Sequence, residues 1–233
     1  MSRLAREDGV SPVVSDYLEA ILILRAEGED AFGATLADMF SVSRANASAT
    51  VQRLARDGLV AVTGRHIALT EAGRRSAEAR MGRHRLSERF LVDVLGMDWA
   101  TVHAEARSFE RGLTDLLEER IDRQLGYPVV CPHGNPIPRA DLDVAGYLRS
   151  RQAIRLSQAP LHASLLVLAI SELIESQVEV LRACAEHGLR PDAPISVEEH
   201  APGATDLTVR GPLGMLTLAT TSAERIWVIH NQE

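Results

Sequence analysis

The sequence predicts a mainly α-helical protein with a small amount of β structure, organised in three domains. Three observations lead to this prediction. Apolar residues recur with helical spacing over most of residues 15–125, and Pro and Gly become dense at 126–138. Short alternating segments then fill the last part of the chain, as expected for strands.

Composition narrows the class of protein. The chain has 233 residues and 45% hydrophobic content, enough for a sizeable core. It has no apolar run of the roughly 18 residues that cross a membrane, and its N-terminus, MSRLAREDG, has no signal-peptide pattern. The two cysteines, Cys131 and Cys184, are too few for a disulfide framework. We therefore expect a cytoplasmic protein with no membrane partner.

Charge is distributed unevenly along the chain. The net charge is −7, but residues from Phe40 to Phe90 include ten arginines and four acidic residues, a local charge of +6. This asymmetry indicates one module that faces a polyanion inside an otherwise acidic protein.

The first helix is expected over SDYLEAILILRAEGED, with Ser15 or Asp16 as its cap and an apolar stripe through Tyr17. Asp16 and Glu19 lie one turn apart at its start. The simplest interpretation of these two acids is that they complement the helix dipole.

A helix-turn-helix is predicted next, with helices over 35–40 and 43–57. Polar and small residues face outward at the start of the second helix, the end that enters a major groove. The expected DNA-contacting residues of this helix are Ser43, Arg44, Ala45, Asn46, Ala49, Thr50 and Arg53.

Two short strands around Gly64 are expected to form a wing, with Arg65 at its tip. Arg53 and Arg65 are assigned to DNA phosphates. A winged helix can also serve protein contacts, but the local positive charge favours DNA.

Long helices are predicted over 71–94 and 98–125. The leucines of the second helix form either a dimer face, since a winged helix that reads a palindrome needs a twofold partner, or part of the core. The remainder, with strands in LLVLAIS, ISVEEH, DLTVRG, MLTLAT and RIWVIH and a helix over 172–187, predicts an SH3-like β-barrel.

A possible metal site occupies the two long helices. His84 and Glu88 are four residues apart, so both project from one helix face, and His103 follows in the next helix. Cys131 and His133 flank a proline in the loop beyond and are candidate additional ligands. Alone, a His/Glu pair at this spacing is more often a solvated hydrogen bond. Five residues further on could also lend an oxygen to the metal, although a solvated helix face is the better interpretation for most of them: Glu172, Glu175, Gln177, Glu179 and Asp192.

The motifs SDYLEAI, RLARDGLV, LTEAGRR, HRLSERFLVDVLGMD, VHAEARSFE and CPHGNPIP together resemble the diphtheria toxin repressor and manganese transport regulator family of metal-dependent transcriptional repressors. The resemblance covers residues 11–139 well and the tail more loosely. It implies a homodimer that binds palindromic operator DNA and represses metal uptake genes. The implied domains are a winged helix-turn-helix at 1–75, a helical dimerisation and metal-binding domain at 76–140, a linker at 141–160 and an SH3-like, FeoA-like domain at 161–233.

The resemblance also implies roles for the candidate ligands. His84, Glu88 and His103 match the family's ancillary site, and Cys131 and His133 match ligands of the manganese- and cobalt-responsive branch. Primary-site members are matched by Asp16, Glu19 and Glu110. Iron-responsive relatives carry Met where this chain has Asp16, so manganese is favoured over iron(II) as the co-repressor.

Two arginines depart from the family's pattern. Arg107 and Arg111 stand where ligands are expected, and a guanidinium has no lone pair to offer a metal. The primary site is therefore degenerate. Either an arginine forms a fork with Asp16, Glu19 or Glu110 in place of the metal, or the first helix moves away and the response is lost or changed. Ala49 replaces a base-contacting Gln of the best-known relative, so a different operator is expected.

Two other functions remain open. One is a metal-independent winged-helix regulator that senses a small anionic ligand through Arg107 and Arg111. The other is a metallohydrolase with zinc at His84, Glu88 and His103, although the sequence marks no general base for it.

Overall fold

The computed structural model describes residues 11–139 and 142–231. The chain forms two compact units, residues 1–82 with 138–146 and residues 83–137 with 147–233, which are described separately. Across the described ranges, no helix combines the length and the apolarity that a bilayer crossing requires.

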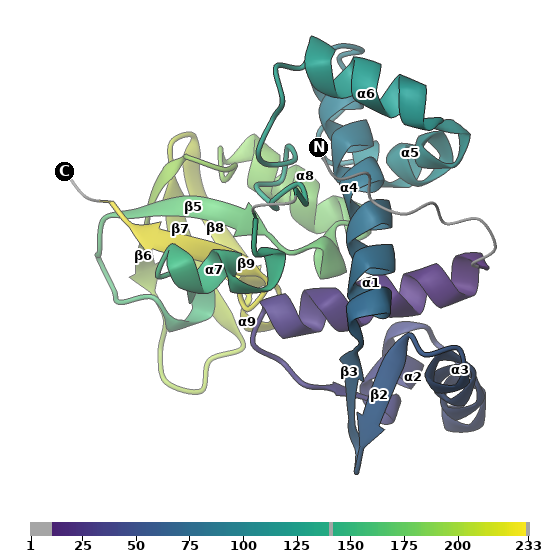
Figure 1. The fold of residues 1–233 in the computed structure, drawn as a ribbon. Helices are drawn as coiled ribbons and strands as arrows, with labels where there is room; N and C mark the ends of the chain where they lie inside the picture. The colour runs from purple at the N-terminus through teal and green to yellow at the C-terminus, as the bar shows by residue number, and fades with distance from the viewer. Residues whose placement is uncertain (1–10, 140–141, 232–233) are drawn as a thin grey trace. The chain divides into compact units, whose positions relative to one another are not determined.

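The first unit is built on helix α1 (Pro12–Ala26), which starts earlier than predicted. Ser11 occupies the N-cap and Pro12 the first turn, where a missing N–H costs nothing, so the expected cap at Ser15 or Asp16 is wrong. From Val14 to Leu24 the apolar residues of α1 are almost fully buried, among them Leu18 and Leu22. α1 contacts strands β1 (Ala31–Phe32) and β3 (His66–Leu69) and the turn η2 (Val144–Gly146). Figure 1 shows α1 beside β3.

Helices α2 (Gly33–Met39) and α3 (Arg44–Arg56) pack on each other, and strand β2 (Val60–Thr63) follows. The sheet has the antiparallel order β1-β3-β2, and β1 was not predicted. The Ser43 hydroxyl caps α3 by accepting from the Asn46 amide at 3.2 Å, which explains where α3 begins.

Helix α4 (Glu71–Asp93) is one continuous helix, as predicted. The Thr70 hydroxyl accepts from the Gly73 amide at 3.1 Å and donates to the Gly58 carbonyl at 2.6 Å. A Cβ at Gly73 would lie 1.9 Å from the Leu59 carbonyl oxygen, so only glycine permits this approach of α4 to the chain after α3.

The single helix expected over 98–125 is wrong. The second unit instead has α5 (Val102–Phe109), the short helix η1 (Glu110–Gly112) and α6 (Asp115–Gln124). The chain becomes extended at Leu113, and the Thr114 hydroxyl accepts from the Leu117 amide to start α6. Leu113 is buried against Leu86, whereas Leu117 is exposed.

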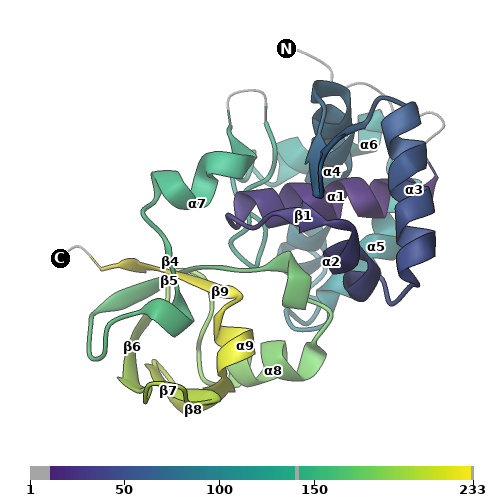
Figure 2. The same ribbon diagram turned by 90° about the horizontal axis from the view of Figure 1, so that it is seen from below.

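The rest of the second unit contains a six-stranded sheet in the order β4-β9-β5-β6-β7-β8; its strands are labelled in Figure 2. The strands are β4 (Ile154–Arg155), β5 (Leu165–Ile170), β6 (Pro194–Glu199), β7 (Asp206–Gly211), β8 (Gly214–Ala219) and β9 (Ile226–His230). This sheet makes the chain a mixed α/β protein, with more β structure than predicted. Strand β4 lies inside the stretch 141–160 that was predicted as a linker. It pairs with β9 and so forms part of the sheet.

Short helices complete this unit: α7 (Tyr147–Ser150), η3 (Leu156–Gln158), η4 (Glu172–Ile174), α8 (Val178–Glu186) and α9 (Thr220–Ala223). α9 contacts β7, β8 and η3 (Figure 2). The helix predicted over 172–187 is thus two helices, η4 and α8. The break between them places Glu175 in the turn directly after η4.

Candidate metal centre

Six side chains with metal-binding atoms meet inside the second unit. His84 and Glu88 come from α4 and His103 from α5, while Cys131 and His133 come from the loop after α6. The sixth is Glu175, one of the possible oxygen donors in a segment that was interpreted mainly as a solvated helix face. The solvated-face interpretation is wrong for Glu175, because this residue is 1% exposed. All six are buried except His103, whose side chain is 12% exposed.

The N/O cluster consists of His84, Glu88, His103 and Glu175, whose ligand atoms all lie within 4.8 Å of one another. His84 Nε2 lies 3.0 Å from Glu88 Oε1 and 3.1 Å from His103 Nδ1. His103 Nδ1 lies 2.9 Å from Glu175 Oε2. The i,i+4 spacing in α4 therefore directs two donors to one point, as the sequence predicted, and α5 adds the third.

The thiol cluster consists of Glu88, Cys131, His133 and Glu175, with ligand atoms again within 4.8 Å of one another. His133 Nδ1 lies 3.6 Å from Glu88 Oε2 and 3.4 Å from Glu175 Oε1. Glu88 Oε2 and His133 Nδ1 are buried and have no hydrogen-bond partner among the described residues. An unsatisfied buried polar atom costs about 1–3 kcal/mol, so these two atoms point to a missing binding partner.

Surrounding groups orient the candidate ligands. Glu110 Oε2 accepts from His84 Nδ1 at 2.8 Å, and the Trp99 carbonyl accepts from His133 Nε2 at 3.0 Å. Each imidazole thereby directs its other nitrogen into the clusters. The Asn135 amide donates to Glu175 Oε1 at 2.9 Å.

A buried ion pair borders the N/O cluster. The Arg85 guanidinium donates from Nε and Nη2 to Glu172 Oε2 at 3.1 and 2.8 Å, and both side chains are at most 4% exposed. Glu172 Oε1 lies 3.9 Å from His84 Nε2 and has no hydrogen-bond partner in the described part of the chain. Nothing in the sequence placed Arg85 at the site, whereas Glu172 was one of the five possible oxygen donors. The available signal was the pair of glutamates immediately after the apolar segment LLVLAIS.

The charges in the clusters shift the pKa values of the histidines. Burial alone would lower the pKa of His103, but its hydrogen bonds to Glu175 and Glu88 outweigh burial and raise it to about 9. For His84, burial opposes the charge of Glu88 and the hydrogen bond to Glu110, and the net effect is a pKa well above the ordinary value. His133 behaves in the same way, because Glu175 and Glu88 outweigh its burial and raise its pKa.

The pKa of Glu88 is lowered, whereas the pKa values of Glu175 and Cys131 are raised. Burial would raise the pKa of Glu88, but His84 and His133 hold it well below its ordinary value. Burial, reinforced by the charge of Glu88, raises the pKa of Glu175 and that of Cys131, the latter to about 11. A divalent ion would favour the deprotonated form of each ligand, since it binds neutral imidazole, carboxylate and thiolate.

The donor set fits a divalent transition metal. Imidazole nitrogen, carboxylate oxygen and one thiolate are ligands for manganese, iron, cobalt or zinc, whereas calcium and magnesium take oxygen ligands. The orphaned atoms of Glu88 and His133 and the orienting contacts of the imidazoles support this assignment.

The remaining predicted metal-site residues have other contacts. In the first unit, Arg80 contacts Asp16 at 2.8 Å and Glu19 at 3.6 Å. Sequence reasoning did not consider Arg80 as a partner of these acids. In the second unit, burial would raise the pKa of Glu172, but Arg85 and His84 lower it, with a smaller contribution from the half-buried Arg107. Arg111 is exposed.

Comparison with known proteins places the chain in a family. Residues 10–67 match a family model described as iron dependent repressor, N-terminal DNA binding domain. Residues 70–139 match iron dependent repressor, metal binding and dimerisation domain, and residues 154–230 match FeoA domain. The iron-dependent repressor IdeR of Mycobacterium tuberculosis is 35% identical over 201 residues, covering 84% of this chain and 87% of that protein. The chain belongs to the iron-dependent repressor family. Its members are DNA-binding transcriptional repressors and not enzymes.

Further relatives agree with this family. The diphtheria toxin repressor of Corynebacterium diphtheriae is 40% identical over 126 residues, covering 54% of this chain and 56% of the relative. A solved structure of a manganese-dependent transcriptional repressor in complex with manganese has a TM-score of 0.77 and 33% identity, covering 94% of this chain and 100% of that one. Because relatives named for iron and for manganese both match, the comparisons leave the metal open.

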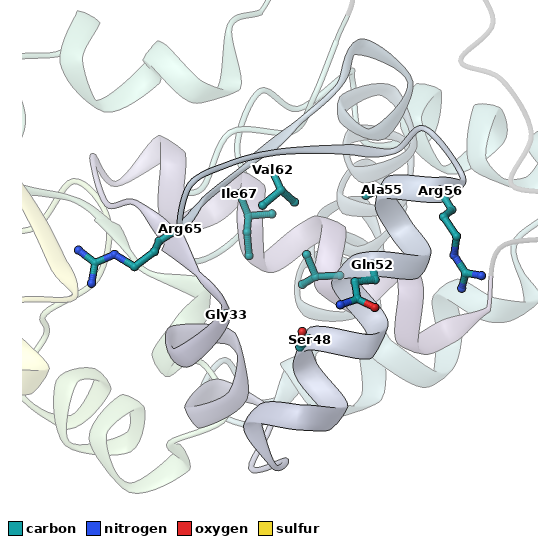
Figure 3. Close-up of a pocket in the computed structure, with 9 residues that line it drawn as sticks. Gly33, Ser48, Gln52, Ala55, Arg56, Val62, Arg65 and Ile67 are labelled. Atoms are coloured by element: carbon teal, nitrogen blue, oxygen red, sulfur yellow. The ribbon is translucent and has the colours of Figure 1, made fainter.

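In the first unit of this iron-dependent repressor family member, the predicted DNA-contacting residues lie on an accessible face. Thr50 is half-buried, and the others are exposed: Ser43, Arg44, Ala45, Asn46, Ala49, Arg53 and Arg65. A pocket of about 690 Å³ lies between α3 and the β2–β3 hairpin. Figure 3 shows Ser48 and Gln52 of α3 facing Val62 and Ile67 of the hairpin across it. Gln52 was not among the predicted DNA contacts.

Proposed function

We propose that this chain is a metal-responsive repressor, in which a divalent ion bound by the buried clusters favours operator binding. The observation that carries the proposal is the convergence of six buried or nearly buried donors, with two unpartnered atoms among them, in a chain of the iron-dependent repressor family. The ion would satisfy those atoms, and it would tie α4, α5, the loop after α6 and the turn after η4 together.

Operator DNA is the proposed partner of the first unit. Helix α3 would enter the major groove of a palindromic site as the second helix of a helix-turn-helix, with β2–β3 as the wing. This assignment is supported by the exposure of Arg44 and Asn46 at the N-terminus of α3 and of Arg65 in the hairpin. Two copies of the chain would bind as a homodimer in the cytoplasm. The exposed Leu116 and Leu117, which are 62% and 48% exposed, suit the dimer contact.

The primary metal site of the family is proposed to be altered in this chain. Arg107 and Arg111 stand at ligand positions, and a guanidinium cannot coordinate an ion. The contact of Arg80 with Asp16 and Glu19 supports the idea that arginine supplies positive charge to these acids. Glu110 contacts His84, so it serves the buried clusters.

Manganese(II) is proposed as the co-repressor in preference to iron(II). The N/O cluster supports this choice, because it offers nitrogen and oxygen donors and no thioether. The Cys131 thiol is a softer donor, so iron(II) is the second candidate.

The experiment is a measurement of operator affinity with manganese, with iron(II) under anaerobic conditions and with a chelator. We expect tight binding with manganese and weak binding with chelator. His84→Ala should remove the difference, and His230→Ala, an exposed histidine of β9, is the matched control that should keep it. If the chelator leaves wild-type affinity unchanged, metal control is excluded.

A further inference from the structure

We propose that the pocket between α3 and the β2–β3 hairpin binds a small aromatic anion, and that the bound anion excludes operator DNA. The pocket lies in the first unit, whereas the buried metal clusters lie in the second. The binding site therefore goes beyond the proposed metal-responsive function, and only its effect on operator binding rests on that function.

The size and the walls of the pocket suit a small ligand. Its volume of about 690 Å³ falls within the roughly 300–1,000 Å³ of typical ligand pockets. Val51 and Ala55 line it from α3, and Val62 and Ile67 line it from the hairpin. Figure 3 shows both hairpin side chains facing α3 across the pocket. Because apolar side chains stand on two opposite walls, a flat apolar body fits between them.

One apolar side chain of the pocket is open to water. Val62 is 49% exposed, whereas Val51 and Ile67 are at most 7% exposed. An aromatic ring in the pocket would remove the surface of Val62 from water, which favours binding. The apolar walls thus supply affinity, and polar groups are left to choose among ligands.

Two polar side chains can orient a ligand. The Ser48 hydroxyl and the Gln52 amide line the pocket from α3, and both residues are exposed. In the described part of the chain neither side chain has a hydrogen-bond partner. A hydroxyl and an amide each donate and accept, so a ligand with a polar substituent would satisfy both groups.

Two arginines give the pocket its preference for an anion. Arg56 and Arg65 lie at its two ends, and both are exposed (Figure 3). Neither guanidinium pairs with a carboxylate among the described residues, and Arg65 contacts only the Phe32 ring, at 6.0 Å from its centre. A guanidinium binds a carboxylate through two parallel hydrogen bonds. DNA phosphate could use the same cations, but it would leave the apolar walls without a matching partner.

Both walls of the pocket are held in place without a ligand. Strand β3 pairs with β1 on one side and with β2 on the other, which fixes the hairpin. The Thr70 hydroxyl donates to the Gly58 carbonyl at 2.6 Å, and the Leu59 amide donates to the Leu54 carbonyl at 2.9 Å, which fixes the end of α3. A preformed pocket loses little conformational entropy when a ligand binds.

A ligand in this pocket would occupy space that DNA needs. The proposed function places α3 in a major groove and the hairpin on the neighbouring backbone or minor groove, so one sugar–phosphate strand must pass between them. The pocket lies in that gap, and its lining includes Arg65, a proposed phosphate contact. A bound anion would block the strand and neutralise Arg65, so the anion and the operator compete.

The test uses 2-naphthoate as the anion and 2-naphthamide as its neutral counterpart. Equilibrium dialysis against the full-length protein in chelator, where no metal can bind the carboxylate, measures both affinities. We expect one naphthoate per chain and about tenfold weaker binding of the amide. With the metal that supports operator binding, the apparent Kd of the operator should rise in proportion to free naphthoate.

Variants locate the binding site. Val62→Trp and Ala55→Trp would fill the pocket from opposite walls, and each should abolish naphthoate binding. The matched control is Met215→Trp, at an exposed position of strand β8, which should bind as wild type. Arg56→Gln combined with Arg65→Gln should remove the preference for naphthoate over the amide, whereas Arg182→Gln on α8 should keep it.

Contrary outcomes are specific. If neither compound binds wild type, or if naphthoate binding survives in both tryptophan variants, this pocket is not the site, whatever the metal response of operator binding. Equal affinities for naphthoate and the amide would contradict the preference for an anion. Bound naphthoate that leaves operator affinity unchanged would overturn the exclusion of DNA. If metal never changes operator affinity, the proposed function fails, and naphthoate binding still decides whether the pocket is a ligand site.

Discussion

His84 and Glu110 are joined by a 2.8 Å hydrogen bond between His84 Nδ1 and Glu110 Oε2, and both side chains are at most 5% exposed. The resemblance to the family implies that Glu110 belongs to a primary site with Asp16 and Glu19. In the structure Glu110 orients a candidate ligand of the N/O cluster. Contacts of this kind fix the imidazole tautomer and increase its basicity as a ligand.

Replacement of Glu110 should therefore weaken metal binding without removing a ligand. We expect Glu110→Gln to lower metal affinity about tenfold to a hundredfold, as found for such orienting groups. Competition with a chromogenic chelator measures the affinity. Glu105→Gln, an exposed acid on α5, is the control. In a His84→Ala background the Glu110 change should have no further effect, and an equal loss in both backgrounds would contradict the orienting role.

The Arg85–Glu172 pair should matter for stability. Arg85→Met leaves the Glu172 carboxylate buried without its cation, which costs about 3–5 kcal/mol in the free energy of unfolding. Urea unfolding in the presence of chelator measures this loss. The pair Arg89–Asp93, in which Asp93 is exposed, is the control, where Arg89→Met should cost at most about 1 kcal/mol. Similar losses of unfolding free energy for Arg85→Met and Arg89→Met would show that burial of the ion pair does not determine the destabilisation.

Metal affinity should rise with pH. In the metal-free protein the pKa of His103 is about 9, so at neutral pH the imidazole is protonated and must release a proton to bind an ion. Apparent affinity should increase toward pH 9, and calorimetry in buffers of different ionisation enthalpy should detect the released protons. A flat profile would show that His103 is not a ligand.

The same shift predicts the opposite trend for the stability of the metal-free protein. A raised pKa of His103 means that the folded state binds the proton more tightly than the unfolded state, whose histidine pKa is about 6.5. The resulting stabilisation is complete below about pH 6.5 and is lost as the pH rises through about 9. Thermal unfolding with chelator should show this loss in wild type, and His103→Ala should reduce it.

Restoring ligands at the altered primary site should add an ion. Arg107→Glu combined with Arg111→His should bind one more equivalent of manganese per chain than wild type, measured by elemental analysis after dialysis. The matched control is Arg120→Glu with Arg123→His, the same exchange of charges on α6. If the first variant binds the same number of manganese ions per chain as wild type, the proposal that these two arginines replace ligands is contradicted.

The proposed DNA contacts should separate into two kinds. Asn46→Ala should cost about 1–3 kcal/mol on the preferred operator and relax its specificity, because Asn46 is proposed to read a base. Arg53→Ala should weaken binding to all sequences and reduce the salt dependence by about one counterion, because it is proposed to contact phosphate. Arg182→Ala, an exposed arginine on α8, should change neither. Equal losses on specific and random DNA for Asn46→Ala would contradict base reading.

Local features were predictable from the sequence because they depend on near neighbours. The i,i+4 spacing of His84 and Glu88 places both on one face of α4 wherever that helix packs. The start of α3 at Ser43 follows from capping chemistry. The break before α6 had the same kind of signal, since Gly112 and Thr114 mark a helix end and a new cap, but the regular leucines favoured one long helix.

The centre itself was determined by tertiary structure. Glu175 is far from Glu88 in sequence, and the polar segment around it resembles a solvated helix face. Only the packing of the turn after η4 against α4 and α5 removes it from water and aims its two oxygens at different imidazoles. The sequence by itself determined which donors exist and which helix face carries the first two. The tertiary structure decided which donors meet, because burial and carboxylate orientation depend on residues distant in the chain.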